Sequence, residues 1–426
     1  MHREVKSLND MGGICDMDGM TVESWCYRES KVDEGRGDPR GEGTENIMNT
    51  GYSVTRSFRS IGPERVESGA GSIDRLAKRL DAVGAKRVLI ASSRSVLANT
   101  PNVRRVEALV GDRLVETFAT CREHSPEEDV DQMVAALEES RADAVVSIGG
   151  SSVFDTVKVA TSRFADRIGA APVPQIAIPT TLSAGEFSPG AGYTSAATGE
   201  KMLVIDYRVA PSCVILDPAA TVDTPEALWL GTGIKALDHA LEAVWSRRPH
   251  PYVDALALEA VRLLFHNLPA TRGSADLEPR AACQLGAWMS IAGVGASGMR
   301  LSHFLGHQIG ARMHIPHGVT SCILLPAVMR YLRDDTLDAQ VRIAAAMGVE
   351  TSGRKREAVA DEGADRLANL IAGLGLPTTL SAAGGKPEDI DAVANASMRA
   401  AAELGLTGDL PDGAESVRAI LLSVYE

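Results

Sequence analysis

The chain is poor in cysteine and aromatic residues, and it lacks any long apolar run. Six cysteines, at positions 15, 26, 121, 213, 283 and 322, show no C-x-x-C spacing, which favours reduced thiols over a disulfide framework or a zinc knuckle. A run of about 18 apolar residues, the length of a transmembrane helix, is absent. The N-terminus also lacks the apolar core of a signal peptide. We therefore expect a cytoplasmic protein.

Positive charge is scarce as well. The chain has 43 lysines and arginines against 56 acidic residues, a formal net charge of −13. This balance excludes nucleic acid and anionic membranes as main partners, because the average surface repels them. An anionic small-molecule substrate would need local positive charge. The interior is rich in small aliphatic residues, with 45% hydrophobic but 4% aromatic residues, as in ordinary α/β and helical enzymes.

The length of 426 residues predicts more than one folded unit. Residues 1–54 are predicted to be a disordered extension, since the first fifty residues are low in apolar side chains and rich in Gly, Asp and Glu. A natural start at Met48 is the alternative. Residues 55–224 are predicted to form an α/β dinucleotide-binding domain, and residues 225–426 an all-helical catalytic domain.

Short apolar strands and amphipathic helices alternate in the first of these domains, which predicts a parallel, Rossmann-like sheet with crossover helices. Expected strands are 87–91, 115–118, 143–148, 174–178 and 212–216, with a hairpin over 192–209 and helices over 72–83 and 125–140. Cap-plus-proline pairs at Ser125 and Thr224 are expected to start helices. Helical spacing then continues through 225–246, 252–267, 277–294, 299–313, 318–331, 337–347, 355–373 and 387–403.

Two polar loops follow apolar strands in the α/β domain. Gly149-Gly-Ser-Ser opens a helix, and Pro179-Thr-Thr-Leu-Ser supplies three hydroxyls. Glycines let the backbone approach an anion, and N–H groups at a helix start bind it. Because both loops follow strands of one sheet, we predict a nucleotide site there.

The G-x-G-x-x-G fingerprint of classical dinucleotide sites is missing after the first strand. Ser92, Ser93 and Arg94 stand there instead. Hydroxyls and a guanidinium could accept a ribose 2′-phosphate, which favours NADPH over NADH, although exposed polar residues in a loop are an equally simple interpretation.

Histidines carry the strongest chemical signal. His303 and His307 are four residues apart, as are Lys235 and His239, so each pair shares one face of a helix. His317 follows Pro316, where it can fold back toward the same point. The spacing predicts an active site in a cleft between the two domains.

These motifs resemble those of the iron-containing alcohol dehydrogenase superfamily, in particular its maleylacetate-reductase-like branch, from about Tyr52 to the C-terminus. The resemblance implies the dehydroquinate synthase-like architecture, an NADH or NADPH cofactor and a homodimer. By position it implies that His239, His303 and His317 bind a divalent metal, iron or zinc, and that His307 lies near the nicotinamide and the substrate. The implied cofactor-binding residues are Gly149, Gly150, Ser151, Ser152, Asp155, Thr180, Thr181, Ser183 and Lys201, besides Ser92 and Ser93.

Lys235 departs from the family pattern, in which an aspartate metal ligand stands four residues before the first histidine. An ammonium group cannot bind a metal ion and repels one nearby. Asp238 is placed to neutralise it as a helical pair. Two mechanisms stay open: a metal-free one, with Lys235 as positive charge and His307 or His239 exchanging the proton, and one with a metal ion on three histidines.

The expected function is an NAD(P)-dependent oxidoreductase of alcohols and carbonyls, or a reductase of a maleylacetate-like keto acid. The segment from His317 to Cys322 resembles the alcohol dehydrogenases more than the reductases. A lyase like dehydroquinate synthase, or a non-catalytic nucleotide-binding relative, is the alternative.

Overall fold

The N-terminal part of the chain is built on one parallel sheet. The computed structural model describes residues 62–293, 298 and 300–426, so the predicted extension 1–54 lies outside the described residues. Six strands follow the order β1-β8-β5-β4-β2-β3, and every neighbouring pair is parallel. They are β1 (Arg65–Ser68), β2 (Val88–Ala91), β3 (Leu114–Phe118), β4 (Ala144–Gly149), β5 (Gln175–Pro179) and β8 (Cys213–Leu216). The predicted α/β fold is confirmed; β1 was not predicted.

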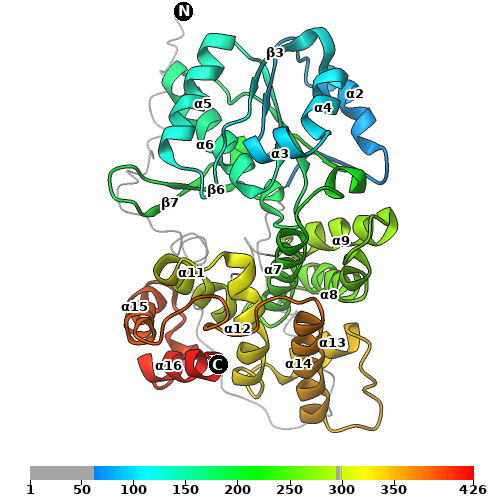
Figure 1. The fold of residues 1–426 in the computed structure, drawn as a ribbon. Helices are drawn as coiled ribbons and strands as arrows, with labels where there is room; N and C mark the ends of the chain where they lie inside the picture. The colour runs from blue at the N-terminus through cyan, green and yellow to red at the C-terminus, as the bar shows by residue number, and fades with distance from the viewer. Residues whose placement is uncertain (1–61, 294–297, 299) are drawn as a thin grey trace, which may run out of the picture.

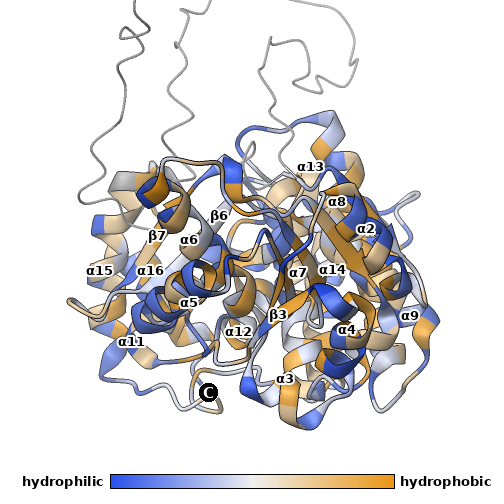
Figure 2. Ribbon diagram, turned by 90° about the horizontal axis from the view of Figure 1, so that it is seen from above, coloured by the Kyte–Doolittle hydropathy of each residue, from blue (hydrophilic) through white to orange (hydrophobic). Residues whose placement is uncertain are grey.

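Helices cover both faces of this sheet because its strands are apolar on both sides. Val88 and Ile90 pack in one core with α2 (Leu76–Ala82) and α4 (Asn102–Val110). Leu89 and Ala91 point the other way, into a core with α5 (Glu127–Ser140) and α6 (Ser151–Ile168). Figure 2 shows hydrophilic residues along α5, while its Val130, Met133 and Leu137 are buried. The short α3 (Arg94–Asn99) follows β2.

A separate antiparallel hairpin lies between β5 and β8 along the chain. Strands β6 (Gly190–Thr194) and β7 (Lys201–Ile205) pair around Gly199, whose φ of +70° suits glycine. The predicted hairpin is therefore present. Figure 1 shows it on the side of the sheet domain that faces the helical region.

The rest of the described chain is helical (Figure 1). Its helices are α7 (Glu226–Val244), α8 (Pro251–Asn267), α9 (Leu277–Ser290), α11 (Leu301–Met313), α12 (His317–Tyr331), α13 (Leu337–Ala346), α14 (Arg356–Gly373), α15 (Asp389–Leu404) and α16 (Ala414–Ser423). All but α16 were predicted. None of the described helices is both long and apolar enough to cross a membrane. The predicted domain boundary at residues 224/225 falls between β8 and α7.

Both predicted helix caps were wrong in the same way. Helices α5 and α7 begin after Pro126 and Pro225, and neither has a side-chain cap. The Ser125 hydroxyl instead donates to the Ser152 carbonyl at 3.0 Å, and that of Thr224 donates to the Thr180 carbonyl at 2.7 Å. Both hydroxyls therefore brace the two polar loops rather than a helix start.

Candidate active site

The two polar loops lie side by side at the carboxyl edge of the sheet. Strands β4 and β5 are neighbours, with Gly149 opposite Pro179. The Thr180 amide donates to the Gly149 carbonyl at 2.9 Å, which joins the loops directly. Parallel sheets bind ligands in the crevice at this edge.

A cleft of about 940 Å³ opens above these loops. It is lined by residues that follow β2, β4 and β5 and by the start of α7, among them Ser93, Arg94, Gly150, Ser151, Ser152, Thr180, Thr181, Ser183, Leu228 and Thr232. Its volume lies in the range usual for cofactor sites.

Glycines create the space for an anion at the bottom of this cleft. Gly149 has φ +152°, and a Cβ there would lie 2.8 Å from Val153 Cγ2. A Cβ on Gly150 would lie 3.2 Å from Thr181 Cγ2. The loop runs straight into the 18-residue helix α6, whose first amides point at the same space. These residues fit the pyrophosphate of a dinucleotide.

Hydroxyl groups from both loops are linked within this cradle. Ser183 contacts Ser151 (Oγ–Oγ 2.6 Å) and Thr181 (Oγ–Oγ1 3.0 Å). Ser93 also lines the cleft, where its Oγ accepts from the Val96 amide. The predicted hydroxyl-rich pocket is thus assembled from three separate strand ends.

Ser92, by contrast, was wrongly predicted to face a nucleotide. Its side chain is fully buried, and its hydroxyl donates to the Ile148 carbonyl at 2.8 Å. It therefore ties β2 to β4 beneath the cleft. Successive side chains of a strand point to opposite faces of the sheet, and the register of β2 turns Ser92 toward the interior.

Asp155 and Lys158 lie behind the cradle rather than in the cleft. The Asp155 carboxylate accepts from the Gly192 amide at 3.2 Å, and burial raises its pKa. The Lys158 ammonium is fully buried and donates to the carbonyls of Gly185 and Ser188 at 2.6 Å each and to Gly190 at 3.2 Å. Lys158 therefore locks the second loop and hairpin onto α6, a role that the sequence did not indicate.

Lys201 starts strand β7 and is exposed. Its side chain passes over Gly192, where a Cβ would lie 2.6 Å from Lys201 Cε. Desolvation is the main cause of the lowered pKa of His307 and of His317, and the charge of Lys201 lowers both further, which places this ammonium near the histidines.

One face of α7 connects the cleft to the histidines. Leu228 and Thr232 line the cleft, and Lys235 and His239 follow at helical spacing on the same side. At 1.5 Å per residue, Lys235 is only about 5 Å further along the axis than Thr232. The Thr232 hydroxyl also accepts from the Leu182 amide at 3.1 Å, which docks α7 on the second loop.

The histidines predicted to meet do meet. His303 and His307 lie one turn apart on α11, with their rings 4.6 Å apart and their Nε2 atoms at 2.9 Å. Helix α11 ends at Met313, and His317 is the first residue of α12, with its ring 4.4 Å from that of His307. The His239 ring is 5.5 Å from His303. Imidazoles from three helices therefore form one cluster.

Lys235 is part of this cluster and is 8% exposed. Its ammonium nitrogen lies 2.7 Å from His303 Nδ1 and 3.2 Å from Asp238 Oδ2. The expected ion pair with Asp238 is present. The same carboxylate oxygen accepts from the Ser321 hydroxyl of α12 at 2.7 Å.

Burial keeps the histidines neutral. Desolvation first, and the charge of Lys235 second, lower the pKa of His239 and of His303 well below the ordinary value. For His307 the causes are desolvation and then His317. Desolvation and Lys201 lower the pKa of His317 to about 3. Near pH 7 each ring therefore carries one proton.

The cluster does not fit a divalent metal ion. Both ring nitrogens of His303 already have partners, Lys235 and His307. The ammonium of Lys235 lies 2.7 Å from His303 Nδ1, and its charge repels a cation at the cluster. Among the described residues, no group of three or more His, Cys, Asp and Glu side chains is arranged to hold a metal. The metal set predicted by resemblance is therefore not formed by these side chains.

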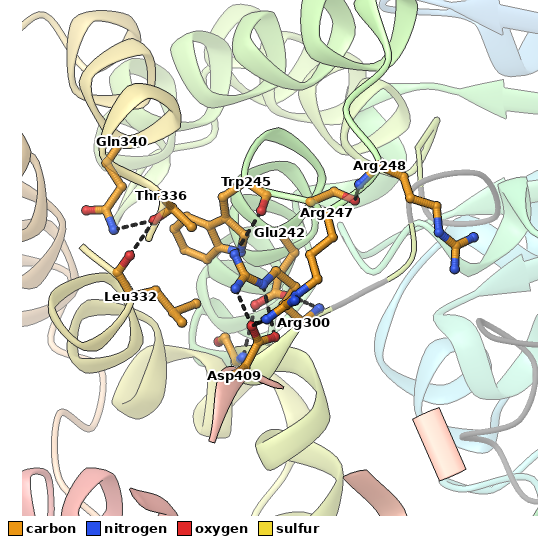
Figure 3. Close-up of polar contacts among 11 residues, drawn as sticks. Glu242, Trp245, Arg247, Arg248, Arg300, Leu332, Thr336, Gln340 and Asp409 are labelled. Atoms are coloured by element: carbon orange, nitrogen blue, oxygen red, sulfur yellow. Dashed lines mark hydrogen bonds and ion pairs between the residues drawn. The ribbon is translucent and has the colours of Figure 1, made fainter. Parts of the chain in front are cut away.

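Glu242 was not predicted to matter, although it lies one turn beyond His239. Its carboxyl group accepts from the Arg300 and Ser302 amides, the latter at 2.9 Å, at the start of α11. Figure 3 shows Arg300 beside it, directed with Arg247 at Asp409. The signal that could have identified Glu242 was its spacing, since residues 235, 238, 239 and 242 share one face of a helix.

The chain matches two models of one family. Residues 63–218 match iron-containing alcohol dehydrogenase, and residues 230–423 match the C-terminal part of the Fe-containing alcohol dehydrogenase family. A maleylacetate reductase from Burkholderia cepacia is 32% identical over 338 residues, which cover 79% of this chain and 89% of the relative. An NAD-dependent methanol dehydrogenase from Bacillus methanolicus is 30% identical over 341 residues, 76% of this chain and 89% of the relative.

Solved structures agree with this match. The crystal structure of maleylacetate reductase from Agrobacterium tumefaciens superposes with a TM-score of 0.73 at 27% identity, covering 87% of this chain and 99% of that one. A 1,3-propanediol oxidoreductase reaches a TM-score of 0.81 at 23% identity, covering 87% of this chain and 100% of that one, and supports the fold alone.

Proposed function

The chain belongs to the iron-containing alcohol dehydrogenase family and is an NAD(P)-dependent oxidoreductase; from this premise we propose that it reduces a maleylacetate-like keto acid without a metal ion. The observation that carries the proposal is Lys235, whose ammonium group lies within the histidine cluster, 2.7 Å from His303. In the family pattern, the residue at this position is an aspartate whose carboxylate binds a metal ion.

The nucleotide loops hold the cofactor in this proposal. Gly149, Gly150 and the first amides of α6 receive the pyrophosphate, while Ser151, Thr181 and Ser183 offer hydroxyls to its oxygens. Bound NAD(P)H supplies a hydride to the substrate. The protein's contribution is to position both reactants and to balance charge.

The histidine cluster serves the substrate's oxygen. His307 lies between His303 and His317 and donates a hydrogen bond to the substrate's carbonyl oxygen, on which negative charge builds up when hydride is delivered. His239, which is 5% exposed, packs behind His303. Lys235 provides positive charge to the cluster from behind, rather than by touching the substrate.

An anionic substrate is favoured by Lys201, a cation near the cluster. Lys201 has no hydrogen bond or ion pair from its ammonium among the described residues, and its charge acts on His307 and His317. In a chain with net charge −13, an ammonium group without an ion pair is a natural partner for a substrate carboxylate. The maleylacetate reductases among the relatives support the same substrate class.

Alcohol–aldehyde interconversion is the second candidate, supported by the methanol dehydrogenase relative. The test is NAD(P)H oxidation with maleylacetate and with simple aldehydes, beside the metal content of the same protein. Faster turnover of the keto acid supports the proposal. Preference for neutral aldehydes supports the second candidate, and no turnover of either contradicts both in favour of a lyase or a non-catalytic nucleotide-binding protein.

We also propose a preference for NADPH, a homodimer and a cytoplasmic location. Arg94 lines the cleft, is exposed and has no ion pair among the described residues, which suits a 2′-phosphate. The dimer rests on the family alone and is checked by light scattering. The four described cysteines are buried free thiols, which fits a reducing compartment.

A further inference from the structure

The hydrogen bonds around His303 have a direction. A lysine ammonium carries donors and no acceptor, so His303 Nδ1, 2.7 Å from Lys235 Nζ, must accept. A neutral imidazole has one proton, which therefore lies on His303 Nε2. Asp238, at 3.2 Å from the ammonium and itself tied to Ser321, balances its charge.

The direction continues to His307. His303 Nε2–H lies 2.9 Å from His307 Nε2, which must then accept. The single proton of a neutral His307 therefore lies on Nδ1. That atom has no hydrogen-bond partner among the described residues, and it is not one of their buried unpartnered atoms, so it faces accessible space.

We propose that Lys235 sets the tautomers of His303 and His307, so that His307 presents an Nδ1–H donor to the oxygen of the substrate carbonyl. The inference rests on the proposed reductase function. Lys235 and His303 are positioning residues, while His307 touches the reacting oxygen. An aspartate or a metal at position 235 would not impose this direction, since neither donates a hydrogen bond.

The same donor accounts for the charge that builds up on the substrate. In a maleylacetate-like acid the keto group is conjugated with a C=C bond, and hydride is delivered, with its two electrons, to the far carbon of that bond. The electrons of the C=C bond shift to the carbonyl oxygen, and His307 Nδ1–H stabilises the resulting enolate by a hydrogen bond. A solvent proton then adds to the carbon beside the keto group as the carbonyl re-forms, so His303 and His307 keep their tautomers throughout.

Two variants of similar length separate hydrogen-bond direction from charge. In Lys235→Gln, the amide nitrogen keeps two N–H donors, one for each of the two acceptors, without charge. Lys235→Met removes the donors. We expect Lys235→Gln to keep kcat within about tenfold of the parent, and Lys235→Met to lose about 100-fold or more with a smaller change in KM. Equal kcat for the two variants would overturn the proposal.

A second readout does not depend on turnover. Nitrogen-15 spectra of ring-labelled histidine, assigned with His307→Asn, report which nitrogen carries the proton. We expect His307 as the Nδ1–H form in the parent and in Lys235→Gln, with that form depleted in Lys235→Met. An Nε2–H form in the parent overturns the inference even if the enzyme reduces carbonyls. An expected spectrum without any reductase activity contradicts only the proposed function.

Discussion

At the residue scale, the molecule separates side chains that read alike in the sequence. Ser92 and Ser93 are neighbours after β2, yet Ser92 is buried against the Ile148 carbonyl and Ser93 lines the cleft. Which one points into the cleft depends on the pleat register of β2, which composition does not reveal. Lys158 and Glu242 were missed for a related reason, because their partners are backbone groups of distant segments.

Arg94 gives the residue-scale prediction. If its guanidinium binds the 2′-phosphate, Arg94→Ala should raise KM for NADPH by about 10- to 100-fold while changing KM for NADH little, because a charge-assisted hydrogen bond is lost. Steady-state kinetics with both cofactors measure this. Arg104→Ala is the matched control, since Arg104 is also exposed but does not line the cleft. Equal shifts for both cofactors would refute the assignment.

At the element scale, the positions of the helices along the chain were predictable, but the contacts between helices were not. Gly and Pro punctuation placed the helices from α7 to α15 within a few residues, because amphipathic spacing persists over long windows. The spacing of His303, His307 and His317 in the sequence also predicted that these side chains lie together. The close crossing of α7 and α12 was not, since it depends on Gly231 and Gly318 meeting.

That crossing predicts a stability effect. A Cβ on Gly318 would lie 3.0 Å from the backbone C and O atoms of Gly231, which cannot move aside as a side chain can. We expect Gly318→Ala to lower the free energy of unfolding by about 1–3 kcal/mol. It should also lower kcat, because α7 and α12 carry Lys235 and His317.

Gly373 supplies the control for this change. It ends α14, and a Cβ there would meet nothing within 4 Å. Gly373→Ala should be neutral or slightly stabilising, because alanine suits a helix better than glycine. Denaturant unfolding of both variants measures the difference. Equal stability of the two would show that α7 and α12 can move apart to accommodate the added Cβ.

Glu242 joins α7 to the start of α11 and makes stability depend on pH. Desolvation, and then repulsion from Asp238, raise its pKa to about 8 from an ordinary value of 4.5. Between these values the unfolded chain loses the proton that the folded chain keeps, so this group's contribution is present below pH 4.5 and is lost as pH rises through about 8.

Glu242→Gln removes this titration. The melting temperature of the parent should therefore fall relative to the variant as pH is raised from 5 to about 8. Thermal unfolding of both proteins across this range gives the comparison. Curves that stay parallel would mean that Glu242 is ionised in the folded protein.

At the scale of the whole molecule, the α/β part and the helical region both contribute residues to the proposed reaction site. The sheet domain supplies the loops rich in glycine and hydroxyl groups, and the helical region supplies the histidines. Helix α7 lies between them: its start lines the cleft, and it carries His239 (Figure 1). The sequence predicted this division because periodicity changes near residue 225. It did not predict which of two mechanisms applies, because that depends on where the Lys235 ammonium points.

The most direct test is reductase activity of metal-stripped protein. Purified protein is treated with a chelator, its residual iron and zinc are measured, and NADPH oxidation with maleylacetate is followed with and without each added ion. Full turnover at metal content far below one ion per chain is predicted, with a metal requirement appearing only in Lys235→Asp. Activity that is lost on chelation and restored by zinc or iron would contradict the account.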